Sequence, residues 1–251
     1  MPQDFDSTKR IYMEVSFGGY LYQKVASAEV EGAYSYQYED KETGEMVTKF
    51  RRKWRATSFG KVINLRLKDS DYGKVLEIQL QTSEDEVEVL SINRKVNKGL
   101  NPFYRDLASK MGNVDWSRPI SFSPNTSKYR TNRDGSIKVN KKGVKMLVPS
   151  LWINYSQKEY VPLKYKYCKR GETPKEGDIP NGEYIEGLDG KEYSSKIPDM
   201  FLDAKMKEAI KSFEDYKNSK SNSAPQPQPQ PTPKSVETPT SNEEEDDDLP
   251  F

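Results

Sequence analysis

The chain has no histidine and only one cysteine, Cys168, among its 251 residues. The missing histidine excludes Ser-His-Asp triads, Cys-His pairs and zinc sites that use histidine. The single cysteine excludes an intramolecular disulfide, and although the cations in YKYCKR would favour its thiolate, a lone thiol is usually incidental. Nucleotide and metal motifs of the GxxxxGK[ST], GxGxxG and EF-hand types are also missing. We therefore expect no catalytic residue, no metal site and no cofactor.

Long apolar runs are missing as well. No stretch approaches the ~20 apolar residues that a membrane helix needs, and the opening residues, MPQDFDSTKR, are too polar for a signal peptide. These features predict a soluble, cytoplasmic protein with no membrane partner. The hydrophobic content of 33% includes 16 Tyr, 9 Phe and 3 Trp, which is enough for a small β-rich core with aromatic residues left for surfaces.

The net charge of +1 hides an uneven distribution. Residues 221–251 carry one positive and seven negative charges; subtracting these from the 40 Lys and Arg and the 39 Asp and Glu leaves 39 and 32 in residues 1–220. The body is therefore about +7 and the tail about −6. Such asymmetry is typical of a basic surface that meets a polyanion, although +7 is also an ordinary charge for solubility.

Apolar and polar residues alternate in a pattern that predicts antiparallel strands joined by hairpins. A second pattern predicts a short helix, because Asn101 and Pro102 suit a helix start and Gly112 suits its end. A longer helix is predicted where Phe201, Met206 and Phe213 recur at helical spacing. The predicted strands cover residues 47–57, 62–68, 74–81, 87–92, 119–122, 129–139 with an Asp134-Gly135 turn, and 145–155, and the second helix covers 197–217.

This order predicts a mainly β fold, an OB-fold-like antiparallel barrel with one short internal helix, a C-terminal helix and a disordered tail. In an OB-fold a helix lies between the third and fourth of five strands; the Tyr-rich N-terminal segment and residues 161–195 would be elaborations. After Lys220 the chain is Ser-, Asn-, Pro-, Gln- and Thr-rich and cannot bury enough surface to fold. We predict an OB-like domain over residues 1–218, a Pro/Gln-rich linker over 219–242 and an acidic tip over 243–251.

The stretch KFRRKWRAT is the most informative part of the body. On a strand, alternate cations share one face, and an aromatic-Arg-aromatic set shares the other. A row of cations is repulsive unless it meets an anion, and exposed aromatic rings can stack unpaired bases. The alternative is that Phe50 and Trp54 belong to the core and that the cations protect a sheet edge from aggregation. The cations that share one face are Lys49, Arg51, Lys53 and Arg55. The aromatic-Arg-aromatic set on the other face is Phe50, Arg52 and Trp54.

Three weaker clusters mix cations and rings: residues 94–98, 138–145 and 164–170. Tyr34, Tyr36 and Tyr38 share one strand face, but the acids nearby favour packing or an interface over nucleic-acid binding. The candidate nucleic-acid-binding residues are Lys49, Arg51, Arg52, Lys53, Trp54, Arg55, Arg94, Lys95, Lys164, Tyr165 and Tyr167.

The last nine residues, EEEDDDLPF, follow a tether in which Pro and Gln alternate, a pattern that favours extended polyproline II. A β-rich body, a flexible linker and this tip together resemble the bacterial and phage single-stranded DNA-binding proteins, whose tip is an Asp-Asp-Asp-Ile-Pro-Phe-like peptide. The match covers roughly the last thirty residues, and the body is larger than the compact domain of that family. The matching residues are Asp246, Asp247, Asp248, Leu249, Pro250 and Phe251, with Leu249 in the place of the usual Ile.

The resemblance implies a divergent, phage-type member that binds single-stranded DNA (ssDNA) and whose tip recruits replication, recombination and repair proteins. It would act in a bacterial cell, or in the host cytoplasm if phage-encoded. Phe251 would anchor the tip in a pocket, and the acids would steer it to basic surfaces. Two alternatives stay open: a metal-dependent nuclease with the same recruitment tail, and a replisome adaptor without DNA affinity. The sequence does not indicate an oligomeric state.

Overall fold

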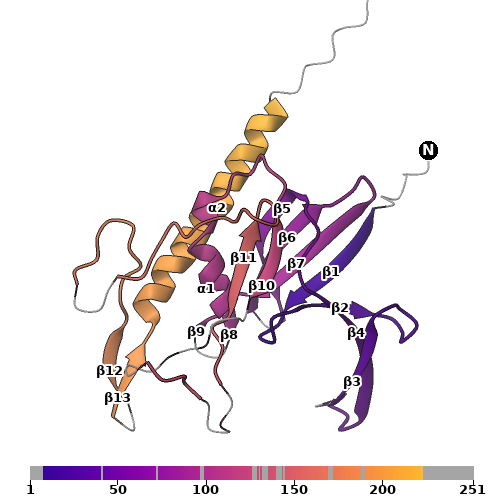
Figure 1. Cartoon of the computed structure of the whole chain (residues 1–251), viewed down its shortest axis with the longest axis horizontal. Helices are drawn as coiled ribbons and strands as arrows, with labels where there is room; N and C mark the ends of the chain where they lie inside the picture. Colours follow the sequence, from indigo (N-terminus) through magenta and orange to yellow (C-terminus); the bar gives the residue numbers. More distant parts are fainter. Residues whose placement is uncertain are drawn as a thin grey trace, which may run out of the picture.

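A computed structural model of the chain is shown in Figure 1. It describes residues 8–222 except 41, 72, 97–98, 126–128, 130, 132–134, 140–142, 144, 169–171 and 188–189. The acidic tip and most of the expected linker lie outside the described residues. The long C-terminal helix continues through Asn222, past the expected start of the linker at residue 219.

One mixed sheet of seven strands, in the order β3-β4-β2-β1-β7-β6-β5, forms the centre of the molecule. These strands are β1 (Lys9–Val15), β2 (Leu21–Val25), β3 (Ala33–Glu39), β4 (Met46–Trp54), β5 (Lys61–Ser70), β6 (Gly73–Gln81) and β7 (Glu86–Asn93). Shorter pairs are β8 (Lys95–Val96) with β9 (Gly99–Leu100), β10 (Ser121–Asn125) with β11 (Ser150–Asn154), and β12 (Glu183–Gly187) with β13 (Gly190–Ser194). The helices are α1 (Pro102–Ala108), the 3₁₀ turn η1 (Met111–Asn113) and α2 (Lys196–Asn222).

The mainly β prediction is confirmed, but an antiparallel barrel is not what the sheet forms. The described strands leave the sheet open, and β1 pairs with β7 in parallel. The physical reason is that β1, which the sequence pattern places among the elaborations, lies along the edge of β7. The hairpin of β10 and β11 approaches the opposite end of the sheet, where Gly60 and Ile120 form an antiparallel bridge.

The locally encoded elements agree with the sequence pattern. β5, β6 and β7 form the expected antiparallel meander. Asn101 caps α1 through its side chain, which accepts a hydrogen bond from the Phe103 amide at 2.9 Å. The helix ends at Ala108, before the expected Gly112, and the Ser109 hydroxyl donates to the Asp106 carbonyl at 2.6 Å, a local bond of the kind that competes with helix continuation. Residues 129–139 form isolated bridges in place of a strand, and the expected Asp134 turn residue is outside the described residues.

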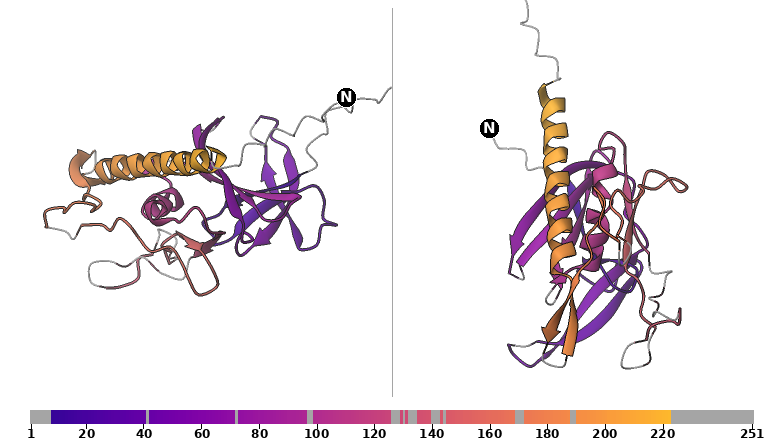
Figure 2. Two further views of the ribbon diagram at one scale, coloured as in Figure 1. Left: turned by 90° about the horizontal axis from the view of Figure 1, so that it is seen from above. Right: turned by 90° about the vertical axis from the view of Figure 1, so that its left-hand side faces the viewer.

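The core lies between one face of the sheet and the layer of α1, α2, β10 and β11 (Figure 2). Leu76, Ile78 and Leu80 of β6 alternate into it, as a half-buried strand requires. Phe103 and Leu107 of α1 are fully buried, and the predicted helical set of α2 is confirmed by the burial of Met206 and Phe213.

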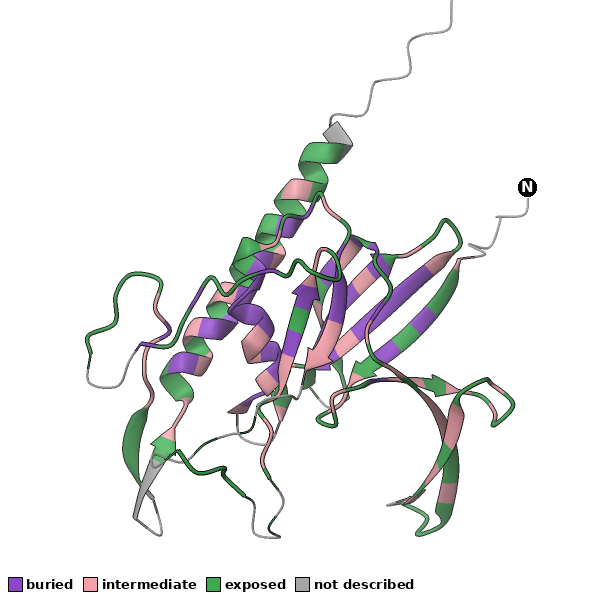
Figure 3. Ribbon diagram, viewed as in Figure 1, coloured by how far each residue is buried: buried purple, intermediate pink, exposed green. Residues whose placement is uncertain are grey.

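The strands β2, β4 and β3 project from the body as a three-stranded arm, which bends away from α2 (Figure 1). In Figure 3 the arm shows almost only half-buried and exposed residues, whereas β6 and β7 are largely buried. Leu21, at the root of the arm, is the point at which the core ends. The arm therefore presents side chains on both faces with few neighbours from the rest of the molecule.

Candidate nucleic-acid interface

The pairing register of the arm brings together residues that are far apart in the sequence. Tyr34 lies opposite Arg51, and Tyr36 lies opposite Lys49. On the other side of β4, Tyr22 lies opposite Lys53. Directly opposed residues in an antiparallel pair point to the same side of the sheet. The ion pair of Lys24 with Glu14 also points to this side, because Lys24 lies opposite Arg51 and Glu14 opposite Tyr22. We use the name ring–cation face for the other rings and cations of this side, which are Tyr20, Tyr22, Tyr34, Tyr36, Tyr38, Lys49, Arg51 and Lys53.

Each cation of the ring–cation face lies over at least one tyrosine ring. The Arg51 guanidinium carbon is 4.0 Å from the centre of the Tyr36 ring and 5.5 Å from that of Tyr22. The Lys53 ammonium is 4.7 Å from the Tyr34 ring, and the Lys49 ammonium is 4.9 Å from the Tyr38 ring. Cation–π contacts at exposed sites contribute only about 0.5–1 kcal/mol each. The contacts therefore arrange the cations without neutralising their charge.

Within the part of the chain that the structure describes, Lys49, Arg51 and Lys53 form no ion pair with a carboxylate. The Arg51 Nε is buried and has no hydrogen-bond partner there. The Tyr38 hydroxyl, more than any other group, raises the pKa of Lys49, so this side chain is cationic at neutral pH. Burial, followed by the Tyr22 hydroxyl, raises the pKa of Tyr34, which keeps that phenol neutral. The face thus carries three cations without a described carboxylate partner, and the Arg51 Nε is a donor without a hydrogen-bond partner among the described residues.

The opposite face of β4 is organised differently. The Trp54 indole N–H donates to the Gln23 side chain at 3.1 Å, and Trp54 packs against the core. The Arg52 guanidinium covers the indole at 4.2 Å. Arg52 and Trp54 therefore lie on the face of β4 opposite to Lys49, Arg51 and Lys53. The two side chains contact each other. Arg55 follows the strand and is exposed.

Arg94, a second candidate, lies in a structural network. Its Nε donates to Asp203 at 2.6 Å, the Tyr104 hydroxyl donates to the same carboxylate at 3.0 Å, and Lys207 pairs with it at 3.0 Å. Burial raises the pKa of Asp203, but the hydrogen bonds from Arg94, Lys207 and Tyr104 outweigh this and hold the pKa at about 2. Arg94 therefore fastens α2 to the end of β7, and its neighbour Lys95 is exposed on β8.

The third group of candidates is divided by burial. Tyr165 is only 8% exposed and packs edge-on against Phe201 of α2, with ring centres 5.6 Å apart. Such a buried ring leaves no face for a base. Lys164 is exposed and donates to the Gly112 carbonyl at 3.2 Å, and Tyr167 is 54% exposed. Of this group only Lys164 and Tyr167 remain accessible to a ligand.

Sequence reasoning did not include the tyrosines of the ring–cation face among the candidate residues for binding a ligand. Their shared strand face was a signal for Tyr34, Tyr36 and Tyr38, but the acids beside them in sequence pointed away from a polyanion. Glu39 lies at one end of β3, opposite Met46, and Glu31 precedes the other end of the strand, whereas the cations that contact the rings come from β4. Strand phase alone cannot reveal which strand will lie opposite.

The described residues contain no group of three or more His, Cys, Asp or Glu side chains that could hold a metal ion. None of the helices that they form is long and apolar enough to cross a membrane. Comparisons with protein-family models, with curated proteins and with solved structures found no match for this chain.

Proposed function

We propose that this chain is a non-enzymatic protein that binds single-stranded DNA without sequence specificity. The observation that carries the proposal is the ring–cation face, where Lys49, Arg51 and Lys53 alternate with tyrosine rings and form no ion pair with a described carboxylate. The cations would follow the phosphates, and the rings would stack unpaired bases, which every base permits through its π-face. A duplex keeps its bases stacked inside and would use only the cations.

The arrangement of the body supports a relation to the OB-fold. The meander β5-β6-β7 is followed by α1 and then by β10 and β11, which is the OB order. Gly60, before β5, exchanges two backbone hydrogen bonds with Ile120, before β10, at 3.0 and 2.9 Å. In this proposal the body is an open OB-like unit of a divergent single-stranded DNA-binding protein, and β1 and the arm are additions that extend its binding surface.

The proposal also gives the acidic tip, residues 243–251, the role of recruiting replication, recombination or repair proteins. Its acids would steer it toward basic pockets in a salt-dependent manner. Phe251 would fill an apolar pocket, and Pro250 would lower the entropy that the peptide loses on binding. The physical separation of the acidic tip from the basic arm by a linker lets one chain contact DNA and a partner protein at the same time.

Fluorescence anisotropy with a labelled oligothymidylate and a duplex of equal length, both at low salt, tests the proposal. We expect tighter binding of the single strand. Replacing Tyr36 by Ala should weaken that binding by about tenfold, because stacking contributes about 1–3 kcal/mol per base, whereas Tyr36→Phe should bind like the unchanged protein. Tyr193→Ala, which removes an exposed ring on the β12–β13 hairpin, is the matched control. Equal affinity for both DNA forms would refute the proposal.

A further inference from the structure

A second pair of exposed aromatic rings is formed by Trp152 of β11 and by Tyr160, which follows β11 and bridges to Asn154. Trp152 and Tyr160 are 39% and 58% exposed, and their ring centres are 5.4 Å apart with a tilt of 36°. Leu151 and Ile153, the neighbours of Trp152 on β11, are completely buried. Trp152 therefore points outward by strand alternation, and the core accounts for neither ring.

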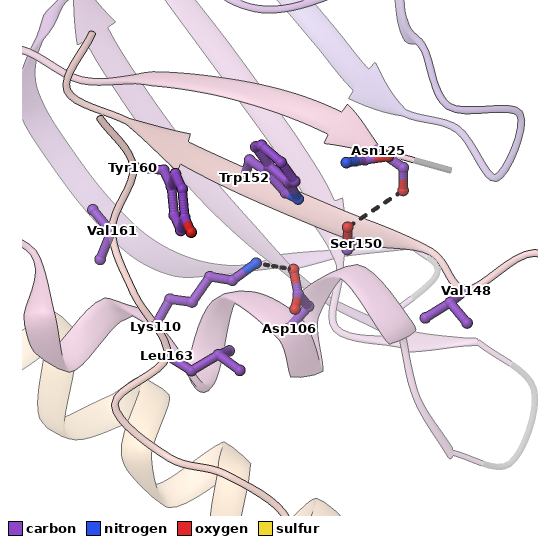
Figure 4. A pocket seen from close by; sticks show the side chains of 9 residues that line it. All are labelled: Asp106, Lys110, Asn125, Val148, Ser150, Trp152, Tyr160, Val161 and Leu163. Carbon is purple, nitrogen blue, oxygen red and sulfur yellow. Dashed lines mark hydrogen bonds and ion pairs between the residues drawn. The ribbon is translucent and has the colours of Figure 1, made fainter. Parts of the chain in front are cut away.

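The two rings border a groove of about 580 Å³, shown in Figure 4. Val148 and Leu163, which are also exposed, continue its apolar wall. Ring and aliphatic surfaces that gather at one exposed hollow are a mark of a binding site. The cavity is of the size that holds a small flat molecule or part of a larger ligand.

The charged groups at the base of the groove are already satisfied. Lys110 pairs with Asp106 and also donates to the Leu151 carbonyl at 3.0 Å. Asp106 in turn accepts from the Leu151 amide at 2.7 Å. This pair of a buried lysine and a half-buried aspartate thus holds the start of β11 and leaves no free charge for a ligand. The interior of the groove suits a neutral, flat ring better than a charged group.

The chain beside the groove, by contrast, carries an exposed cation. Lys158 lies two residues before Tyr160 and is exposed. The acid nearest to Tyr160 in sequence, Glu159, is engaged by Arg118 through two hydrogen bonds of 2.8 and 2.7 Å. A ligand that combines flat neutral rings with a negatively charged backbone is complementary to such a surface.

The groove also continues in the direction of a residue that the sequence had indicated. A second hollow of about 280 Å³ shares Val148 and Leu163 with the first and reaches Tyr167 and Lys166. Rings at intervals along these two adjoining hollows, with Lys166 beside Tyr167 in the second, match the requirements for stacking successive bases of one strand.

We infer that the groove between Trp152 and Tyr160 is a second binding site for unpaired nucleobases of a single strand, separate from the ring–cation face. The inference rests on the proposed function, because it assigns this groove to the same ligand class. It predicts that one DNA strand contacts both the arm and the hairpin. Trp152 and Tyr160 would then be stacking residues, and Lys158 and Lys166 would lie beside the phosphates.

Tryptophan fluorescence tests this inference, because a base stacked on an indole quenches its emission. The chain has three tryptophans; Trp116 is buried, and Trp54 is half-buried with its N–H bonded to Gln23. Unlabelled oligothymidylate should quench the emission of the unchanged protein and of Trp54→Phe. The quenching should be lost in Trp152→Phe, which keeps an aromatic ring and removes the reporter. Trp152→Ala combined with Tyr160→Ala should bind about tenfold more weakly by anisotropy.

The outcomes separate this inference from the function on which it rests. If anisotropy shows no binding of single-stranded DNA to the unchanged protein, the proposed function fails and this inference fails with it. If the protein binds DNA but Trp152→Phe keeps the full quenching, only the second site is refuted. A synthetic peptide of residues 243–251 is the competing ligand; quenching of Trp152 by this peptide but not by the oligonucleotide would identify the groove as a peptide site and would also refute the inference.

Discussion

Replacing Lys49, Arg51 and Lys53 together by glutamine should reduce both the affinity for single-stranded DNA and its dependence on salt. These three cations lie on one strand face and form no ion pair with a described carboxylate, so bound phosphates would be their partners. Glutamine keeps a polar side chain beside the tyrosine rings, shorter than lysine or arginine, and removes the charge. The arm should therefore keep its pairing while it loses its attraction for the phosphates.

The size of the effect follows from counterion release. For single strands the logarithm of the binding constant falls with the logarithm of salt by about 0.7 per neutralised phosphate, so three contacts contribute a slope of about −2. Between 50 and 200 mM salt, a slope of about −2 corresponds to a loss of affinity of about 20-fold. The triple variant should lack this part of the slope, so its affinity should fall less steeply as salt is raised.

Anisotropy titrations over a salt series, with circular dichroism to verify the fold, provide the measurement. The matched control removes three cations that already have carboxylate partners: Lys9 with Glu86 at 2.8 Å, Lys74 with Asp69 at 3.0 Å and Lys205 with Glu208 at 2.8 Å. It has the same net charge as the arm variant but should keep most of the slope. An equal change of slope in both variants would show that only total charge matters and would refute the assignment of the phosphates to the ring–cation face.

Three further predictions concern the tail and the body. Truncation after Lys220 removes seven carboxylates and should tighten single-stranded DNA binding at low salt, because those acids compete for the basic surface; unchanged affinity in the same anisotropy assay would contradict this. Asp203→Asn should lower the free energy of unfolding at pH 7 by about 2 kcal/mol, since the pKa of this carboxyl is held at about 2. That stabilisation is present above the unfolded pKa of about 3.9 and is lost as the pH falls toward 2, so urea titrations of the variant should show a flatter acid limb. Gly60→Ala should lower the free energy of unfolding by about 1–3 kcal/mol, because a Cβ there would lie 2.8 Å from the Gln81 carbonyl oxygen. Gly18→Ala, whose Cβ would meet nothing closer than 3.6 Å, should be tolerated, and thermal melts of the two variants compare them.

The parts of the fold that the sequence predicted are those whose signal is local. β5, β6 and β7 alternate cleanly and are joined by short turns, so neighbours in sequence are also neighbours in the sheet. The Asn101 cap and the helical spacing in α2 are likewise encoded within a few residues. The parallel pairing of β1 with β7 has no such signal, because it depends on an edge that only the folded meander provides.

The candidate site shows the same limit at the level of single side chains. Strand phase correctly placed Lys49, Arg51 and Lys53 on one face. It could not indicate that tyrosines of β3 would cover these cations, because the register between two strands is a property of their pairing. Tyr165 and Tyr167 are equivalent in the sequence pattern, yet Phe201 of α2 buries the first ring and leaves the second exposed.

The parallel pairing of β1 also has a consequence for the order in which the chain folds. Lys9 at the start of β1 pairs with Glu86 of β7, a separation of 77 residues. Contacts between residues so distant along the chain form slowly, because the entropy of closing a long loop is lost before the contacts contribute favourable free energy. β1 and the arm are synthesised before the edge against which they lie, so we expect this strand, although made early, to dock after the meander of β5, β6 and β7. Until β1 docks, the nascent chain exposes the basic, tyrosine-rich strands of the arm. Contact with nucleic acid at that stage would compete with folding.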